Sequence, residues 1–220
     1  MDLVHTLFVP PGGGPHPTIL ALHGWGANAL DLLGLAPYIG SGRYLVLCPQ
    51  GTVQMSLGPG AVGYGWFPST GGGPPDLPAI AAAHEHLLAF LDTACQRYPI
   101  DPRKLVLLGF SQGGVMAYRL GLSAPERFAA IVALSTWLPT AFLDERPPVE
   151  ASTHPPLFIQ HGTRDELVSV ERARQSVQAL RPLGAPVTYR EYDMGHEINA
   201  RSLTDLSAWL QERGLAPLVA

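Results

Sequence analysis

Short apolar runs with no polar alternation recur along this chain, and each ends in a turn signal. The five most continuous runs read "TILAL", "YLVL", "LVLL", "AIVAL" and "PLFIQ". Strands buried on both faces have this unbroken hydrophobic pattern, which is typical of parallel sheets. Two further runs, Val4–Val9 and Val187–Tyr192, are also predicted strands, the second partly alternating as an edge strand does.

Segments with helical spacing of apolar residues separate these runs. The predicted helices cover Asp76–Arg97, Gly113–Leu122, Ser169–Leu180 and Ser202–Arg213. Strands that alternate with helices predict a mostly parallel sheet with right-handed crossovers. In such sheets the functional residues lie beyond the carboxyl ends of the strands, so the residues after each run are the candidates.

The composition fits one domain and excludes several function classes. With 220 residues, 46% of them hydrophobic, we predict a single domain over residues 1–220. The net charge of −4 and the lack of a basic run exclude a nucleic-acid partner.

No window predicts stable membrane insertion, and the N-terminus does not resemble a signal peptide, so we expect a cytoplasmic protein. Cys48 and Cys95 are expected to be unpaired buried thiols. Glycine and proline clusters such as "SLGPGAVGYG" and "STGGGPPDLP" predict loops.

Three loops after predicted strands carry a serine, an acid and a histidine in that order. They read "GFSQGG", "HGTRDELV" and "DMGHEI", and the residues are Ser111, Asp165 and His196. Gly109 and Gly113 flank the serine, as a tight strand-to-helix turn requires. A serine hydroxyl needs a base to take its proton, and the base needs an acceptor that fixes its tautomer. The order predicts a nucleophile, an acid and a base.

Other residues could in principle take these roles. Asp193 lies close to His196 in sequence, and Glu166 is adjacent to the favoured Asp165. His23 and His161 precede glycines at strand ends and are predicted to be structural, hydrogen-bonded histidines.

An oxyanion hole would complete the chemistry. The amide of Gln112 follows the nucleophile, and the loop "HGWG" after "TILAL" is placed to supply the second donor, for which we select the Trp25 N–H. Aromatic and apolar residues near the strand ends are candidate walls of an acyl pocket: Trp66, Phe67, Trp137, Leu138 and Val168.

Charged and metal-binding groups give weaker signals. No lysine or arginine is placed for a phosphate group, and Arg164 is expected to be solvated. His84 and His86 lie two residues apart on a predicted helix and point to different faces, so no metal site is predicted.

Six longer segments of the sequence resemble those of one known protein family. "LHGWGANALDLLGLA", "GYGWF", "GFSQGGVMA", "ALSTWLP", "HGTRDELV" and "GHEI" resemble segments of the phospholipase/carboxylesterase family of α/β-hydrolases, relatives of the acyl-protein thioesterases. The resemblance covers about Thr18 to Trp209. It implies an α/β-hydrolase fold with helices on both faces of the sheet, no large cap domain and no cofactor. Pro68 replaces the aspartate that often follows Trp-Phe, so the pocket wall and the substrate range are expected to differ.

The sequence therefore predicts a serine carboxylesterase that cleaves small-molecule esters of small to medium acyl chain, because nothing resembles a lid helix. An acyl-thioesterase or lysophospholipase would use the same triad, and a homodimer stays open. A peptidase would need an anchor for a charged peptide end, and none is evident. A non-catalytic ligand-binding protein of this fold is the alternative from another class, disfavoured because all three triad residues are present.

Overall fold

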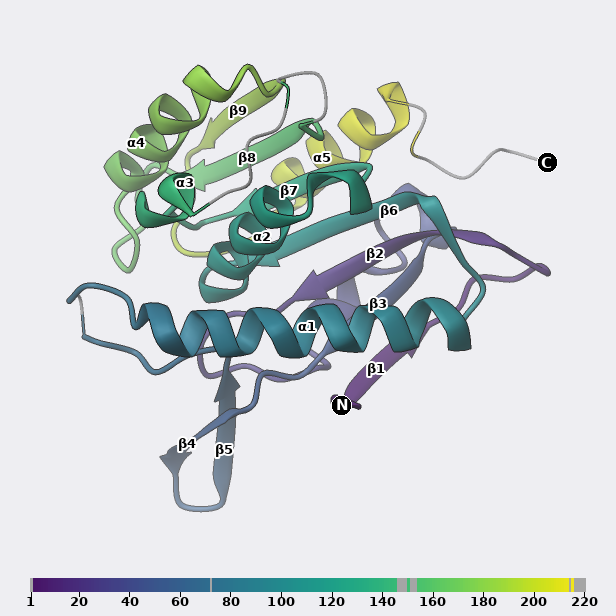
Figure 1. Ribbon diagram of the computed structural model, residues 1–220, viewed down its shortest axis with the longest axis horizontal. Coiled ribbons are helices and arrows are strands. Elements are labelled where there is room, and N and C mark those ends of the chain that lie inside the picture. Colours follow the sequence, from purple (N-terminus) through teal and green to yellow (C-terminus); the bar gives the residue numbers. More distant parts are fainter. Residues whose placement is uncertain (1, 72, 146–149, 151–153, 214, 216–220) are drawn as a thin grey trace.

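A seven-stranded sheet forms the centre of the computed structural model, which describes residues 2–71, 73–145, 150, 154–213 and 215 (Figure 1). The strand order is β1-β3-β2-β6-β7-β8-β9, and every neighbouring pair is parallel except β1 with β3. Each predicted strand is confirmed, and β9 lies at an edge. The strands are β1 (His5–Phe8), β2 (His16–Leu22), β3 (Leu45–Pro49), β6 (Ile100–Phe110), β7 (Ala130–Leu134), β8 (Leu157–Gly162) and β9 (Val187–Tyr192).

All four predicted helices are present, and a fifth, short helix follows β7. The helix after β9 begins two residues before the predicted start, because Asn199 and Ser202 form a reciprocal capping box. Apart from the crossover helices, the described segments between strands hold no helical insertion longer than the four-residue α3. The helices are α1 (Leu77–Arg97), α2 (Gln112–Ser123), α3 (Ala141–Asp144), α4 (Val170–Leu180) and α5 (Ala200–Glu212).

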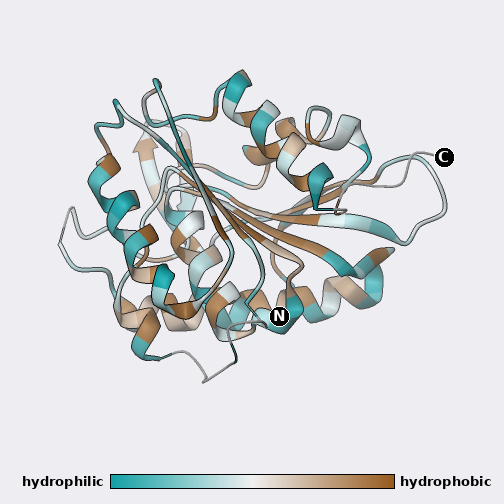
Figure 2. Ribbon diagram, turned by 90° about the horizontal axis from the view of Figure 1, so that it is seen from above, coloured by the Kyte–Doolittle hydropathy of each residue, from teal (hydrophilic) through white to brown (hydrophobic). Residues whose placement is uncertain are grey.

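Helices cover both faces of the sheet (Figure 2). Side chains alternate between the faces along each strand. On β2, Leu20 and Leu22 pack with the core beneath α1, α2 and α4, whereas Ile19 and Ala21 pack with the core beneath α5 and the short 3-10 segment Leu32–Leu35. Two buried faces explain why the strand sequences are continuously apolar.

A β-hairpin occupies part of the region that was predicted as a loop, and that prediction is wrong there. β4 (Val53–Gly58) pairs antiparallel with β5 (Ala61–Gly65), and Figure 1 shows the pair projecting from the body of the protein. Pro59 and Gly60 form the tip, where Gly60 has φ +74°. The base of β5 holds the loop after β2: the Gly26 amide donates to the Tyr64 carbonyl at 2.9 Å, and the Tyr64 amide donates to the Ala27 carbonyl at 2.8 Å.

The two cysteines are unpaired, as predicted, but only Cys48 is buried. Cys95 is exposed, because α1 buries a stripe that includes Leu87, Leu91 and Ala94 at helical spacing, and Cys95 falls outside it. Within the described residues, no helix has both the length and the apolar character needed to cross a membrane.

Candidate active site

Ser111 occupies the sharp turn between β6 and α2, with φ 53° and ψ −118°. This conformation is strained for a residue with a Cβ atom. Its amide donates to the Leu134 carbonyl at 2.9 Å, and the Thr136 hydroxyl donates to the Ser111 carbonyl at 2.7 Å. The neighbouring strand β7 and the residues after it therefore hold the strained backbone in place.

The two glycines beside this turn are required by close backbone approach. A Cβ atom on Gly109 would collide with the backbone of Gly113, and one on Gly113 would collide with the carbonyl oxygens of Leu22 and His23. The structure thus gives the physical reason for the predicted Gly-x-Ser-x-Gly turn.

His196 and Asp165 meet beside the serine, although they come from different loops. His196 Nδ1 lies 2.8 Å from Asp165 Oδ2. The Asp165 side chain is fully buried, and its Oδ1 accepts hydrogen bonds from the amides of Leu167 and Val168 at 2.9 and 2.8 Å. The Phe110 ring packs against the His196 imidazole, with 4.8 Å between the ring centroids. The acid and the imidazole are thereby fixed relative to each other.

The alternative acids do not take this place. Asp193 forms an exposed ion pair with Arg164, with 2.6 Å between Oδ1 and Nε, and the Glu166 side chain is exposed. The structure brings Asp165 to His196, as the sequence favoured.

Both strand-end histidines predicted to be structural make buried hydrogen bonds. His23 donates from Nδ1 to the Gly24 carbonyl and accepts from the Gly51 amide at Nε2, so it is a neutral imidazole. His161 Nε2 lies 2.7 Å from the Val168 carbonyl. Burial lowers the pKa of both side chains, because the protonated form loses its hydration.

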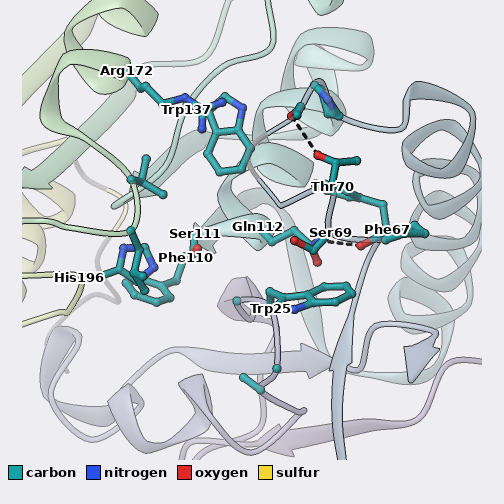
Figure 3. A pocket seen from close by; sticks show the side chains of 18 of the residues that line it. Trp25, Phe67, Ser69, Thr70, Phe110, Ser111, Gln112, Trp137, Arg172 and His196 are labelled. Atoms are coloured by element: carbon teal, nitrogen blue, oxygen red, sulfur yellow. Dashed lines mark hydrogen bonds between the residues drawn. The ribbon is translucent and has the colours of Figure 1, made fainter. Parts of the chain in front are cut away.

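The two residues predicted as oxyanion donors lie side by side at the site. The loop Gly24–Ala27 carries Trp25 and is held against β5, and Gln112 begins α2. No acceptor for either backbone amide is found among the described residues. The Gln112 side chain acts separately from its amide, since it accepts from the Trp66 amide at 2.7 Å. It also donates to the Phe67 carbonyl at 2.7 Å (Figure 3).

A cavity of about 650 Å³ opens at the serine, and Ser111 lies between His196 and Gln112 in Figure 3. Of the predicted wall residues, Phe67, Trp137 and Val168 line it. Two predictions are wrong for this cavity. Trp66 is 3% exposed, and its indole N–H donates to the His23 carbonyl. Leu138 lines a separate, neighbouring cavity.

Several lining residues were missed from the sequence: Asp31, Ser69, Thr70, Phe110, Leu167 and Arg172. Phe110 and Leu167 could have been found, since each is next in sequence to a predicted site residue or its loop. Arg172 puts a basic residue on the cavity wall, although no lysine or arginine was expected to be placed for a phosphate group and no anchor for a charged peptide end was evident. The signal was its place in the first turn of a helix that starts just after the acid loop.

No metal site is present among the residues described: no group of three or more histidine, cysteine, aspartate or glutamate side chains could hold an ion. His84 binds Ser123 and Glu85 instead.

Known proteins resemble this chain in both sequence and structure. Acyl-protein thioesterase 1 of Gibberella zeae is 35% identical over 117 residues, which is 52% of this chain and 50% of that protein. A protein of Arabidopsis thaliana named "Probable carboxylesterase SOBER1-like" is 28% identical over 160 residues, 70% of this chain and 61% of that protein. This chain thus spans half to three-fifths of the length of these curated relatives.

The crystal structure of esterase PE8 superposes with a TM-score of 0.84 at 26% identity, covering 96% of this chain and 99% of that one. The model of the family described as Phospholipase/Carboxylesterase matches residues 5–213, nearly the whole chain. The chain therefore belongs to the phospholipase/carboxylesterase family of α/β-hydrolases.

Proposed function

We propose that this protein is a serine carboxylesterase in which Ser111 is the nucleophile, His196 the general base and Asp165 the acid. One observation carries the proposal. The strained turn holds Ser111 on the wall of the same cavity as His196. The Nδ1 atom of His196 lies 2.8 Å from the buried Asp165 carboxylate. A strained backbone at a cavity, beside an oriented imidazole, is the arrangement that activates a serine.

In the proposed reaction, His196 Nδ1–H donates to Asp165, which leaves Nε2 to take the Ser111 proton. Ser111 Oγ then attacks the ester carbonyl. The Trp25 and Gln112 amides stabilise the oxyanion, and His196 protonates the leaving alcohol. Water repeats the sequence on the acyl-enzyme and releases the acid. The central sheet takes its seven strands from His5 through to Tyr192, which supports treating residues 1–220 as one domain.

Two further aspects of substrate choice belong to the proposal. The cavity of about 650 Å³ is within the range of small-molecule sites, which supports esters of small to medium acyl chain. Thioesters are an equally supported second class, because relatives carry the name acyl-protein thioesterase and the same triad cleaves both bonds. A purely ligand-binding role is disfavoured, since it would not require the strained serine.

Hydrolysis of p-nitrophenyl acetate, butyrate, octanoate and palmitate tests the proposal, with wild type and Ser111→Ala measured side by side. We expect turnover by wild type only, with kcat/KM greatest below palmitate. A paired oxygen ester and thioester of the same acyl chain then measures the preferred bond. Equal turnover by the folded Ser111→Ala variant would refute the mechanism.

A further inference from the structure

Arg172 is a cation on the wall of the candidate active site, and no acidic side chain of the described residues pairs with it. It is the only arginine or lysine among the described residues that line the cavity. Its guanidinium carbon lies 4.0 Å from the centroid of the Trp137 ring. No described carboxylate forms an ion pair with it, whereas Arg164 is paired with Asp193 and Arg119 with Glu145. Its guanidinium is thus available to a ligand.

The arginine lies where two cavities adjoin. A second cavity of about 370 Å³ shares Pro75, Trp137 and Arg172 with the first, so the stacked Trp137–Arg172 pair separates the two spaces. Figure 3 shows Trp137 on the Ser111 side of Arg172. A ligand that reaches the guanidinium from the serine passes along the Trp137 ring.

A buried serine holds the backbone segments that carry Arg172 and Trp137. The buried Ser176 hydroxyl donates to the Arg172 carbonyl at 2.7 Å and accepts from the Leu138 amide at 2.8 Å. One side chain therefore ties the first turns of α4 to the segment that carries Trp137. These bonds hold the backbone, and the guanidinium itself rests on the Trp137 ring, which limits the conformational freedom that it loses when it binds a ligand.

We propose that Arg172 binds a carboxylate on the substrate, remote from the scissile bond, so that the enzyme prefers anionic esters. One face of the guanidinium is covered by the indole, and its in-plane N–H donors match a carboxylate. A single cation matches the single negative charge of a carboxylate. Partial burial, which lowers the pKa of Arg172, strengthens its attraction for an anion. Asp31, on the loop that follows Trp25, also lines the cavity. Its carboxylate would repel an anion bound near that loop.

This inference rests on the proposed esterase function. The carboxylate could sit on the acyl or the alcohol half, and the two halves need separate substrates. For the acyl half, mono-p-nitrophenyl adipate is compared with neutral p-nitrophenyl heptanoate. For the alcohol half, 4-(butyryloxy)benzoate is compared with its neutral methyl ester.

The variants are Arg172→Met, Arg172→Lys and the matched control Arg164→Met, which removes a paired arginine outside the cavity. For one of the two substrate pairs, we expect Arg172→Met to lower the anionic-to-neutral ratio of kcat/KM by roughly tenfold or more, mainly through KM. Arg172→Lys should retain part of the preference, and Arg164→Met all of it. Because both esters of a pair are measured on the same variant, their ratio cancels any loss of activity that the two esters share.

Calorimetric titration of adipate into Ser111→Ala gives a readout that needs no turnover, with Ser111→Ala/Arg172→Met as its control. Binding that disappears with Arg172 supports the inference, even if no ester is cleaved and the esterase proposal fails. Ester cleavage without charge preference and without adipate binding would overturn the inference and leave the esterase proposal intact. Neither cleavage nor binding would overturn both.

Discussion

His161 Nε2 lies 3.2 Å from Asp165 Oδ2, the same oxygen that meets His196 Nδ1 at 2.8 Å. Both the His161 and Asp165 side chains are fully buried. The inner histidine also contacts the Val168 carbonyl, which belongs to the loop whose amide binds Asp165. His161 therefore lies behind the proposed acid, and we expect it to position the Asp165 carboxylate.

Replacing His161 with leucine should lower kcat while KM stays nearly constant, because Asp165 loses a contact that fixes its orientation. The free energy of unfolding should fall by about 1–3 kcal/mol, since the Val168 carbonyl is left without its buried donor. His161→Gln, which can restore a donor, should recover part of both losses. Steady-state kinetics and urea unfolding measure the effects. A leucine variant with wild-type kcat would contradict the positioning role.

The strained backbone at Ser111 should lower the stability of the protein, whereas the Ser111 hydroxyl should be required for activity. Ser111→Ala should reduce kcat by a factor of about 10³ or more and leave the fold intact. Ser111→Gly should be equally inactive but more stable than the alanine variant by about 1 kcal/mol, because glycine adopts φ 53° without strain. Thermal unfolding of both variants makes the comparison. Lower stability of the glycine variant would mean that the turn stores no strain.

The turn glycine Gly113 should not accept a side chain. Gly113→Ala forces a Cβ atom against the Leu22 and His23 carbonyl oxygens, so we expect a loss of about 1–3 kcal/mol or more and much lower activity. Gly34→Ala is the control, because a Cβ atom there meets nothing within 4 Å. Its stability should change by no more than about 0.5 kcal/mol. Equal effects at both positions would refute the steric argument.

The Gln112 side chain should stabilise the pocket wall independently of its backbone amide. Gln112→Leu leaves the Trp66 amide and the Phe67 carbonyl unpaired, so the free energy of unfolding should drop by about 1–3 kcal/mol for each group. Gln112→Glu should be at least as damaging, because it buries a carboxylate and sets an oxygen against the Phe67 carbonyl oxygen. Both can be measured by chemical denaturation. No difference from wild type would show that the segment is held by other contacts.

Stability should decrease on the acid side of neutrality. Burial lowers the pKa of His23, His84 and His161 in the folded protein. Below about pH 6.5, the ordinary histidine value, the unfolded chain therefore binds more protons than the folded one, and protons favour unfolding. Urea unfolding at a series of pH values should show a falling free energy of unfolding as the pH decreases. His161→Gln should have a shallower dependence, and a flat wild-type profile would contradict the assignment of neutral buried histidines.

The sequence alone determined the sheet, the four main helices and the order of the proposed triad. These features depend on local signals: unbroken apolar runs mark strands buried on both faces, and the glycines around Ser111 mark a turn that tolerates no Cβ atom. Parallel topology then brings the strand-end loops to one edge, so the sequence alone predicts that Ser111, Asp165 and His196 lie close together.

Only the tertiary structure decided the β4–β5 hairpin, the exclusion of Asp193 and Glu166 as partners of His196, and the lining of the cavity. Trp66 and Phe67 are adjacent in sequence, yet only Phe67 lines the cavity, because Gln112 fixes how that segment turns. The place of Arg172 just after the acid loop makes it a candidate, but it does not reveal the stacking on Trp137. Its place beside Trp137 depends on the packing of α4 against a loop that follows a different strand, and such distant contacts leave no local pattern in the sequence.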